Sequence, residues 1–334
     1  MTARYICAPA SSVKSAKFSI RSRTFFDVPA PHSTPAHVYR RRRLLAGLIS
    51  LVILGALVRI GTSTFENFSR AGNQILETVI PTPVDPCPDA NPFPADFVSA
   101  WTSAHNAVDY QAVAYNPETD CTYLIGSSTG VYPTASTVKL LIATSILEKV
   151  TAGTLVLADV RSDLELMITI SSNEAAQRLW TTAGGKQIVA QIANEYGLQH
   201  TTAGKKWGTT QTNAEDQVSL FKQVVLTKPA SLSDETWNLL RTLLASVDAE
   251  QHWGAGYGLP DGWTFMVKNG WYHTAPGDDG PENKSRVNTV GAAVDPTGKA
   301  RWVFSGYSNT WDTDAQGIDA WNALSSQLVA AWGK

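Results

Sequence analysis

Hydrophobic positions divide the chain into parts of different character. One uncharged apolar run, Leu44–Val58, directly follows four arginines, Arg40–Arg43. From residue 96 to residue 334 the apolar positions recur with helical or strand spacing, which predicts one globular domain. Residues 61–95 contain six prolines within Pro81–Pro94, too many for a packed helix or sheet. We therefore expect residues 61–95 to be a stiff linker between the apolar run and the domain.

The periodicity within residues 96–334 changes twice. It predicts a helix and two strands joined by a turn, then a block of helices, then three strands and a last helix. The predicted helices are 96–109, 136–150, 164–169, 174–181, 186–196, 215–226, 233–244 and 319–332, and the predicted strands are 111–115, 121–125, 264–268, 286–294 and 301–307. Because strands lie at both ends of this order, we expect an α/β fold of the α+β type. One antiparallel sheet would be built from both chain ends and flanked by helices, with an all-helical subdomain inserted.

The apolar run has the composition of a membrane-spanning helix but is short for one. Its fifteen residues reach roughly 22 Å as a helix, whereas a bilayer core is ~30 Å thick. Ile60 prolongs the run, and Arg59 can extend its charged end to the far interface. A cleaved signal peptide or a weak twin-arginine export signal is the alternative. Against cleavage, 43 residues precede the run and no clear cleavage site follows it.

Charge is distributed in agreement with an anchor. Residues 1–43 carry nine Lys and Arg residues and one acid, Asp27, whereas the rest of the chain carries 18 basic and 28 acidic residues. Basic residues collect on the cytoplasmic side of a membrane helix. We therefore expect a signal anchor over residues 44–60, a disordered cytoplasmic tail over residues 1–43 and an extracytoplasmic domain, secreted if the anchor is cleaved. The acidic body disfavours nucleic-acid binding, and we expect a monomer.

Composition excludes several protein classes. With 43% hydrophobic and 17% charged residues, the chain is neither a disordered polymer nor a collagen-like repeat. Of its three cysteines, Cys7 falls in the predicted tail, whereas Cys87 and Cys121 fall on the exported side, where a disulfide can persist. We expect a Cys87–Cys121 disulfide; the alternative is two small buried hydrophobic residues.

A serine and a lysine lie one turn apart at the start of the predicted helix 136–150. Ser136 and Lys139 are three positions apart, so their side chains share a helical face. A serine in the first turn lies beside free backbone N–H groups and the positive helix end. A desolvated lysine with a lowered pKa can act as the base that a serine nucleophile needs. Taken alone, the pair fits a helix cap and a surface lysine better.

A second polar group precedes the predicted helix 174–181. Ser171 and Asn173 alternate, so on an extended turn they point the same way. A hydroxyl there can pass a proton to a leaving nitrogen, and an amide can hold a substrate carbonyl. The simpler interpretation is an N-terminal helix cap formed by Ser172 or Asn173, with Glu174 in the first turn.

A third polar group, Lys268-Asn269-Gly270-Trp271, ends a predicted strand. Lys268 would supply a second positive charge that lowers the pKa of a nearby lysine or binds a substrate carboxylate. Gly270 would allow a substrate to lie close to the strand edge. The alternative is an ordinary strand end, and Lys206-Trp207-Gly208 has a similar pattern.

Together and in this order, the three groups resemble the motifs of the serine penicillin-recognising enzymes, in particular the class A β-lactamase-like branch. The S-x-x-K motif matches Ser136 and Lys139, S-x-N matches Ser171 and Asn173, and a modified K-T-G matches Lys268, Asn269 and Gly270. The stretches 132–136 and 171–176 also look like this family. The resemblance covers about residues 96–333 and implies the serine β-lactamase and DD-peptidase fold, with no cofactor and no metal.

The resemblance implies a role for each residue and a class of substrate. Ser136 would be the acylated nucleophile, Lys139 its base, Ser171 the proton shuttle and Lys268 the second cation, with Asn173, Asn269, Gly270 and Trp271 binding the substrate. The backbone N–H groups of Ser136 and Trp271 would form the oxyanion hole. The implied substrates are β-lactams or peptidoglycan-like peptides.

The chain departs from the family in the loop after the predicted helix 186–196. Class A β-lactamases carry a glutamate there that activates the deacylating water, whereas residues 197–211 contain no Asp or Glu. Glu195 and Glu215 flank the loop but fall in predicted helices. Asn269 also replaces a hydroxyl residue that usually binds the substrate carboxylate. We therefore expect acylation with slow deacylation.

The sequence thus predicts a membrane-tethered, extracytoplasmic serine hydrolase that forms an acyl-enzyme on Ser136. A slow β-lactamase is the enzymatic alternative. The non-enzymatic alternative is a catalytically weak pseudoenzyme that binds cell-wall peptides or β-lactams in the same cleft.

Overall fold

Strands from the two ends of the domain lie side by side in one antiparallel sheet. The computed structural model describes residues 4–5, 87, 91–274 and 283–333. The sheet has six strands in the order β1-β3-β2-β8-β7-β6, and the junction between early and late strands is β2 against β8, with Tyr110 opposite Ser308. The predicted α+β fold, with one sheet from both chain ends, is therefore confirmed.

The elements follow the predicted order closely. The strands are β1 (Arg4–Tyr5), β2 (Tyr110–Asn116), β3 (Cys121–Gly126), β4 (Tyr132–Pro133), β5 (Gln211–Thr212), β6 (Thr264–His273), β7 (Ser285–Val294) and β8 (Ala300–Ser308). The α-helices are α3 (Ala95–His105), α4 (Val138–Thr151), α5 (Leu157–Thr169), α6 (Asn173–Ala183), α7 (Gln187–Tyr196), α8 (Ala214–Phe221), α9 (Asp234–Ala245) and α10 (Asp314–Trp332). Short helical turns are η1 (Ala135–Thr137), η2 (Trp207–Thr209), η4 (Ala249–Gln251) and η5 (Gly254–Gly256), and the π-helix η3 (Lys222–Leu226) prolongs α8.

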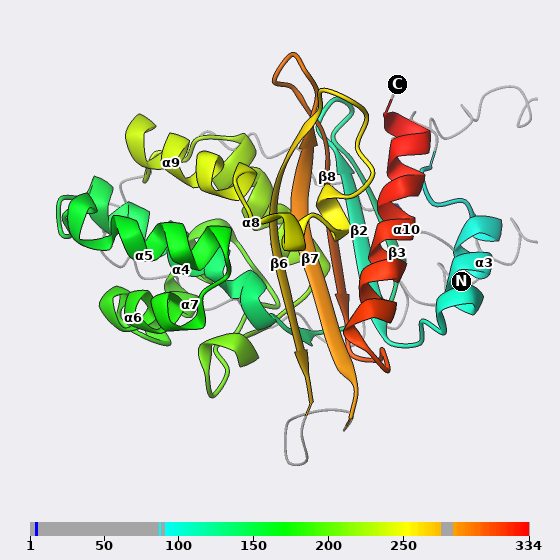
Figure 1. The fold of residues 1–334 in the computed structure, drawn as a ribbon, viewed down its shortest axis with the longest axis horizontal. Helices are drawn as coiled ribbons and strands as arrows, with labels where there is room; N and C mark the ends of the chain where they lie inside the picture. The colour runs from blue at the N-terminus through cyan, green and yellow to red at the C-terminus, as the bar shows by residue number, and fades with distance from the viewer. Residues whose placement is uncertain (1–3, 6–86, 88–90, 275–282, 334) are drawn as a thin grey trace, which may run out of the picture. The chain divides into compact units, whose positions relative to one another are not determined.

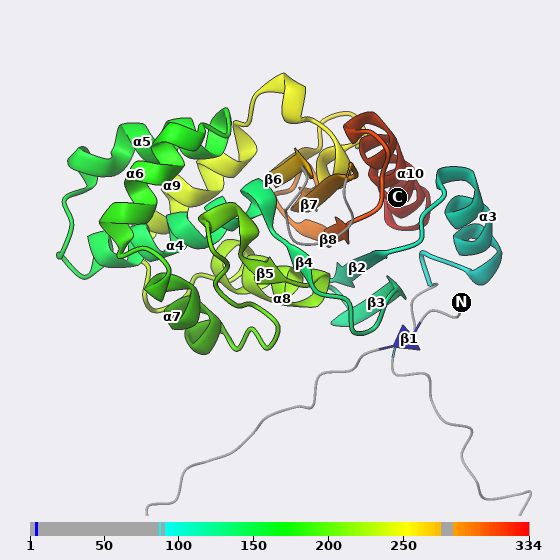
Figure 2. The ribbon, with the colours of Figure 1, turned by 90° about the horizontal axis from the view of Figure 1, so that it is seen from below.

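Helices cover both faces of the sheet (Figure 1). α3 and α10 pack on one face, where the rings of Trp101 and Trp321 stack 6.0 Å apart. α8 and the helical subdomain of α4–α7 and α9 lie on the other side, and the short β4–β5 pair runs between sheet and helices (Figure 2). Alternation along β2 sends Val113 into the core on the helical side and Ala112 and Ala114 into the core under α10.

The helix that follows the candidate nucleophile is buried all round. The sequence predicts an amphipathic helix over residues 136–150, but every residue from Val138 to Leu147 is buried. The cause is the inserted subdomain, because α5, α6, α7 and α9 all pack against α4. A buried helix holds its side chains in fixed positions, which favours a catalytic role for a polar residue on it.

The N-terminal predictions fall mainly outside the described residues. The linker up to residue 86, the anchor over residues 44–60 and nearly all of the tail over residues 1–43 are among them. Arg4 and Tyr5 are the exception: they pair with Leu124 and Tyr123 as the edge strand β1, where the sequence predicts disorder. None of the helices in the described ranges is both long enough and apolar enough to cross a membrane.

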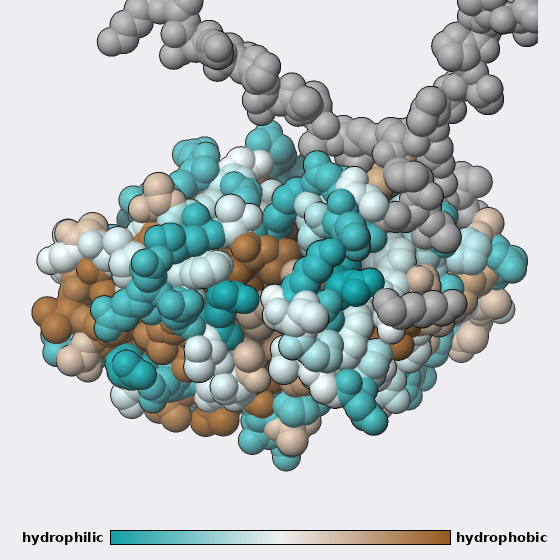
Figure 3. Space-filling view, turned by 90° about the horizontal axis from the view of Figure 1, so that it is seen from above, coloured by the Kyte–Doolittle hydropathy of each residue, from teal (hydrophilic) through white to brown (hydrophobic). Residues whose placement is uncertain are grey.

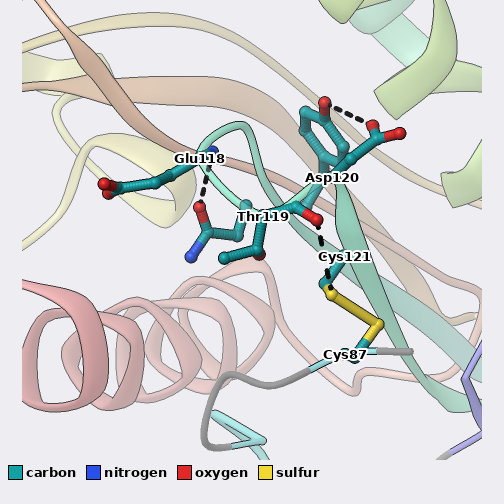
Figure 4. Close-up of a disulfide and its surroundings, with 7 residues drawn as sticks. Cys87, Glu118, Thr119, Asp120 and Cys121 are labelled. Atoms are coloured by element: carbon teal, nitrogen blue, oxygen red, sulfur yellow. Dashed lines mark hydrogen bonds between the residues drawn. A yellow bond between two sulfur atoms is a disulfide. The ribbon is translucent and has the colours of Figure 1, made fainter. Parts of the chain in front are cut away.

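The predicted disulfide is present in the structure. Cys87 and Cys121 are bonded with their Cα atoms 5.4 Å apart (Figure 4). Both cysteines are also buried, as the alternative of two small buried hydrophobic residues predicted. The bond fastens the end of the predicted linker to the start of β3.

One face of the domain is chemically uneven (Figure 3). Apolar residues gather at the end formed by the helical subdomain. Within that subdomain Val156 and Ile170, which flank α5, are 62% and 53% exposed. The part of that face above the sheet is mostly polar.

Candidate active site

A strained turn presents Ser136 at the start of α4. Ala135, directly before it, has a φ of 49°, in the left-handed region that side chains with a Cβ rarely adopt. The buried Asn288 of β7 holds this turn, since its Nδ2 donates to Pro133 O at 2.8 Å and to Thr134 O at 3.2 Å. A buried residue of β7, next to the edge strand β6, thus fixes the position of the candidate nucleophile.

Lys139 lies one turn further along α4 and is fully buried. Its Nζ donates to Ser171 O at 2.6 Å, to Ser171 Oγ at 3.1 Å and to Asn173 Oδ1 at 2.9 Å. Desolvation lowers the pKa of Lys139 to about 8, although Glu174 acts in the opposite direction. The amine therefore loses its proton close to neutral pH, as a general base must.

Lys268 approaches the same hydroxyl from β6. Its Nζ donates to Ser171 Oγ at 3.0 Å and to Asn269 O at 2.8 Å. Complete burial, and after it the charge of Lys139, hold the pKa of Lys268 well below its usual value. Because Ser171 Oγ accepts from both lysines, its own hydrogen is directed elsewhere and is available to a third group.

The simpler interpretation of the second motif also holds. Ser172 is the N-cap of α6, and its Oγ accepts a hydrogen bond from Ala175 N at 3.2 Å. Ser171 has a φ of 57°, so the chain turns sharply just before the cap. This turn and this cap place Ser171 and Asn173 on either side of the Lys139 ammonium, so capping and site geometry arise from the same few residues.

β6 packs directly against the turn that carries Ser136. Gly270 pairs with Asn288 across the β6–β7 ladder. A Cβ on Gly270 would lie 2.5 Å from Ser136 N and 2.7 Å from Thr137 N, closer than van der Waals contact allows. Only glycine lets the strand and the serine turn come this close.

The variant Gly270→Ala is expected to push the serine turn away from β6. The clash is with backbone atoms, so relief requires the turn to move, at a cost of about 1–3 kcal/mol. We expect a lower melting temperature and an at least tenfold slower reaction of Ser136 with penicillin, measured by thermal melting and by mass spectrometry. Gly208→Ala adds the same methyl group to the opposite wall, where its nearest neighbour is 4.0 Å away. Equal loss in both variants would contradict the argument.

Ser136 opens into a cavity of about 520 Å³, a volume typical of small-molecule sites. Its walls come from four places in the chain: Ala135 and Ser136 of η1, the α6 face of Asn173, Gln177 and Trp180, the loop residues Lys205 to Thr209, and Trp271 and Tyr272 of β6. Trp271 is 39% exposed, so an aromatic surface is available beside the serine.

Asn269 does not reach this cavity. Its side chain is fully buried, and its Nδ2 donates to Gln251 O at 2.8 Å and to Trp253 O at 3.3 Å. The alternation of β6 turns Asn269 toward these backbone carbonyls. Its amide hydrogens are therefore occupied by the protein and not directed at a substrate.

The loop between α7 and α8 covers the lysine. Trp207 in η2 places its ring centroid 5.2 Å from Lys139 Nζ, and Thr134 N donates to Thr210 O at 2.8 Å. Among the described residues that line the cavity there is no Asp or Glu. Of the two flanking acids, Glu195 is exposed on α7, and Glu215 accepts a hydrogen bond from Gln111 Nε2 at 3.3 Å.

Two stretches have the composition of a catalytic motif without its structural context. Lys206-Trp207-Gly208 resembled the third motif only by composition, yet it forms a wall of the cavity. Residues 126–130 read Gly-Ser-Ser-Thr-Gly, a G-x-S-x-G pattern, but the chain runs from β3 to β4 there and not into a helix. Gln177 and Trp180 carried no motif, and their spacing along a helix was their one signal.

Comparison with curated proteins finds relatives at low sequence identity. A protein named "Putative lipoprotein LppW", from Mycobacterium tuberculosis and Mycobacterium bovis, is 26% identical over 190 residues. The match covers 52% of this chain and 60% of the relative, so this chain spans less than two thirds of these curated relatives.

Solved structures share the fold at low sequence identity. A mutant of PBP-A, captured as an acyl-enzyme with penicillin G, superimposes with a TM-score of 0.59 at 21% identity, covering 71% of this chain and 94% of that one. A β-lactamase from Chitinophaga pinensis gives a TM-score of 0.61 at 14% identity, covering 71% and 98%. A variant of the reconstructed ancestor of Gram-negative class A β-lactamases gives 0.60 at 18%, covering 71% and 97%.

A family model also matches the chain directly. It is described as the beta-lactamase enzyme family and spans residues 159–332, which is just over half of the chain. The matched range contains Ser171, Asn173 and Lys268, whereas Ser136 and Lys139 precede it. With this match and the shared fold, the chain belongs to the beta-lactamase enzyme family.

Proposed function

We propose that this protein is an extracytoplasmic serine hydrolase that forms an acyl-enzyme on Ser136 with β-lactams or peptidoglycan-like peptides, and that it releases the acyl group slowly. One observation carries the proposal: a buried lysine with a pKa of about 8 lies one turn after a serine that opens into a cavity. The same lysine bonds to Ser171 and Asn173, which supports a shared role.

Acylation uses the groups around Ser171. Neutral Lys139 takes the proton of Ser136 Oγ while the oxygen attacks the substrate carbonyl. The carbonyl carbon–nitrogen bond then breaks, and the Ser171 hydroxyl gives its proton to the leaving nitrogen and regains one from a lysine. Among the described residues Lys139 Nζ makes no hydrogen bond to Ser136 Oγ, so we infer that this contact forms when substrate enters. Such contacts often tighten only in the substrate complex.

Deacylation lacks an evident base. A water molecule must be deprotonated to attack the ester, and the described cavity walls supply no carboxylate for this step. The Trp207 ring lies over the buried amine and reduces access of water from the side of the loop. We therefore expect the ester on Ser136 to persist far longer than it takes to form.

A labelled penicillin followed by intact-mass measurement tests the proposal. We expect an adduct of one penicillin per chain that persists after the free drug is removed. Rapid hydrolysis of a chromogenic β-lactam without a persistent adduct would instead support a β-lactamase. No adduct at millimolar drug would leave a pseudoenzyme that binds in the cleft, the alternative that the loop without Asp or Glu over residues 197–211 suggests.

We also propose that the domain is exported and tethered by a membrane helix over residues 44–60, with a cytoplasmic N-terminus. The arginines before that run and the lipoprotein name of the relatives support an exported domain. The pairing of β1 with β3 argues for the opposite placement of residues 4 and 5, since a tail cannot pair with a domain across a bilayer.

Cys7 decides between these placements. Cys87 and Cys121 are bonded to each other, and the chain has three cysteines in all. A membrane-impermeant maleimide is therefore expected to label the protein only after cells are lysed. Labelling of Cys7 in intact cells, checked with Cys7→Ser, would overturn the cytoplasmic tail and support a domain-bound N-terminus.

A further inference from the structure

Gln251 lies behind the two lysines of the site, at the end of η4, and is 4% exposed. Its Oε1 accepts a hydrogen bond from Lys268 Nζ at 3.3 Å, and its Nε2 donates to Thr169 O at 2.9 Å. Its backbone oxygen accepts from Asn269 Nδ2 at 2.8 Å. One residue therefore ties β6 to the end of α5, just before the turn that carries Ser171.

Gln251 is a neutral partner for a buried cation. The described partners of Lys268 Nζ are all uncharged oxygens, namely Ser171 Oγ, Asn269 O and Gln251 Oε1. The charge that acts on Lys268 is that of Lys139, and it is repulsive. Two buried amines around one hydroxyl cannot both remain protonated cheaply, so one of them holds a proton that is easily given up.

Acids near this pair are turned to solvent. Glu174 at the start of α6 acts on Lys139, but its side chain is exposed. On η4, Asp248 and Glu250 are exposed, and Asp248 Oδ1 accepts the Glu250 N–H at 3.0 Å.

Cations on the elements that pack against β6 face other partners. On α9 the Arg241 guanidinium lies 4.6 Å from the Trp237 ring centroid. On β7 the Arg286 guanidinium lies 5.1 Å from the Tyr272 ring centroid. Neither cation is among the groups that shift the pKa of Lys268, which are burial and the charge of Lys139. Gln251 is the side-chain amide among the acceptors of Lys268 Nζ, so a substitution there can add a charge without changing the size of the side chain.

We propose that Gln251 is a positioning residue for acylation of Ser136: it holds the Lys268 amine against the Ser171 hydroxyl through a neutral acceptor, which keeps one amine of the pair available as a base. This inference rests on the proposed function. A carboxylate at the same position would hold Lys268 equally well but would favour two charged lysines and remove the base.

The isosteric variant Gln251→Glu tests the neutral acceptor. It places a negative charge within about 4 Å of Lys268 Nζ, a distance at which opposite charges raise a lysine pKa by one or more pH units. When the rate of penicillin acylation is plotted against pH, it should rise as the base loses its proton; we call this rise the limb. In Gln251→Glu we expect the limb to lie at least about one pH unit higher, with at least tenfold slower acylation at pH 7. The control Gln191→Glu adds the same charge to the exposed side of α7 and is expected to leave the limb in place. An unmoved limb in Gln251→Glu overturns the inference.

A second variant tests whether the hydrogen bond between Gln251 and the Lys268 amine matters apart from any change of charge. Gln251→Met keeps the length of the side chain but replaces the amide oxygen by a thioether sulfur, which is only a weak hydrogen-bond acceptor. We expect slower acylation with no upward movement of the limb, because the amine loses its acceptor and gains no counter-charge. A wild-type rate in Gln251→Met contradicts the holding role, and it does so even if Gln251→Glu fails to fold.

Lysine NMR keeps this test independent of catalysis. In full-length protein with labelled lysines, the two buried ε-amines are assigned with Lys139→Met and Lys268→Met and titrated in wild type and Gln251→Glu. A raised pKa in Gln251→Glu supports Gln251 as the neutral acceptor of the buried lysine pair even if the wild type forms no adduct; absence of an adduct then contradicts the proposed function and, with it, the role of Gln251 in acylation. An unchanged titration overturns the inference even if Ser136 is acylated normally.

Discussion

The variant Ser136→Ala is expected to form no covalent adduct with penicillin and to remain folded. The alanine removes the attacking oxygen but keeps the Cβ, so the turn between the strained Ala135 and α4 retains its packing. Removing the nucleophile of a serine hydrolase costs at least about 10³-fold in rate. Intact-mass measurement after exposure to millimolar drug, together with a thermal melt, checks both halves of this expectation.

A second serine supplies the matched control. Ser128 occupies the serine position of the Gly-Ser-Ser-Thr-Gly stretch and is exposed between β3 and β4. Ser128→Ala is expected to be acylated like the wild type. An adduct that survives in Ser136→Ala and disappears in Ser128→Ala would identify Ser128 as the nucleophile.

The variant Lys139→Met is expected to slow acylation by at least about 10²-fold, because a general base of this kind contributes that much or more. Methionine fills most of the volume of the buried lysine, so the packing of α4 is retained better than with alanine. The rate of adduct formation under single-turnover conditions is the quantity to compare.

The pH dependence gives a separate test of the same role. Neutral Lys139 is the active base, so acylation of the wild type should rise as the pH is raised through about 8, the pKa of that amine. In Lys139→Met this rise should disappear. Lys149→Met, near the end of the same helix, serves as the control for loss of a positive charge. Equal rates in Lys139→Met and wild type would remove this lysine from the mechanism.

Local patterns were sufficient for the two inner strands β7 and β8. Both were predicted within two residues at each end, because β-branched and aromatic residues recur along them. β6 was predicted to end at Lys268 but continues to His273. Its second half, residues 269–273, contains no aliphatic side chain and interrupts the apolar pattern, while its backbone still pairs with β7.

Helix starts were lost where polar or small residues hide the period. α10 begins at Asp314, capped by Thr313 Oγ1, and not at residue 319 as predicted. Gly317 obscures its first turn, yet there the helix packs tightly on Trp311 and Val287. α5 begins at Leu157 and not at residue 164 as predicted. The sequence pattern missed its first half because exposed charged residues there, such as Asp159 and Arg161, hide the apolar period.

The residues of the candidate site also fall into those that a local pattern predicts and those that it does not. Ser136, Lys139, Ser171 and Lys268 were predicted from spacing and resemblance, because each lies in a short motif. Asn288 and Gln251 carried no such signal. Their positions matter only through contacts with segments far away in sequence: Asn288 Nδ2 reaches Pro133 O, and Gln251 Oε1 reaches Lys268 Nζ.

Locating the acyl group is the most direct test of the account. Loss of an adduct in a variant can follow from a distorted site, whereas a modified residue in the wild type identifies the nucleophile positively. The full-length protein is treated with benzylpenicillin, denatured in acid and digested, and the modified peptide is sequenced by tandem mass spectrometry. The account predicts one modification, on Ser136. A modification on any other residue, or none under conditions in which the cavity binds the drug, would contradict it.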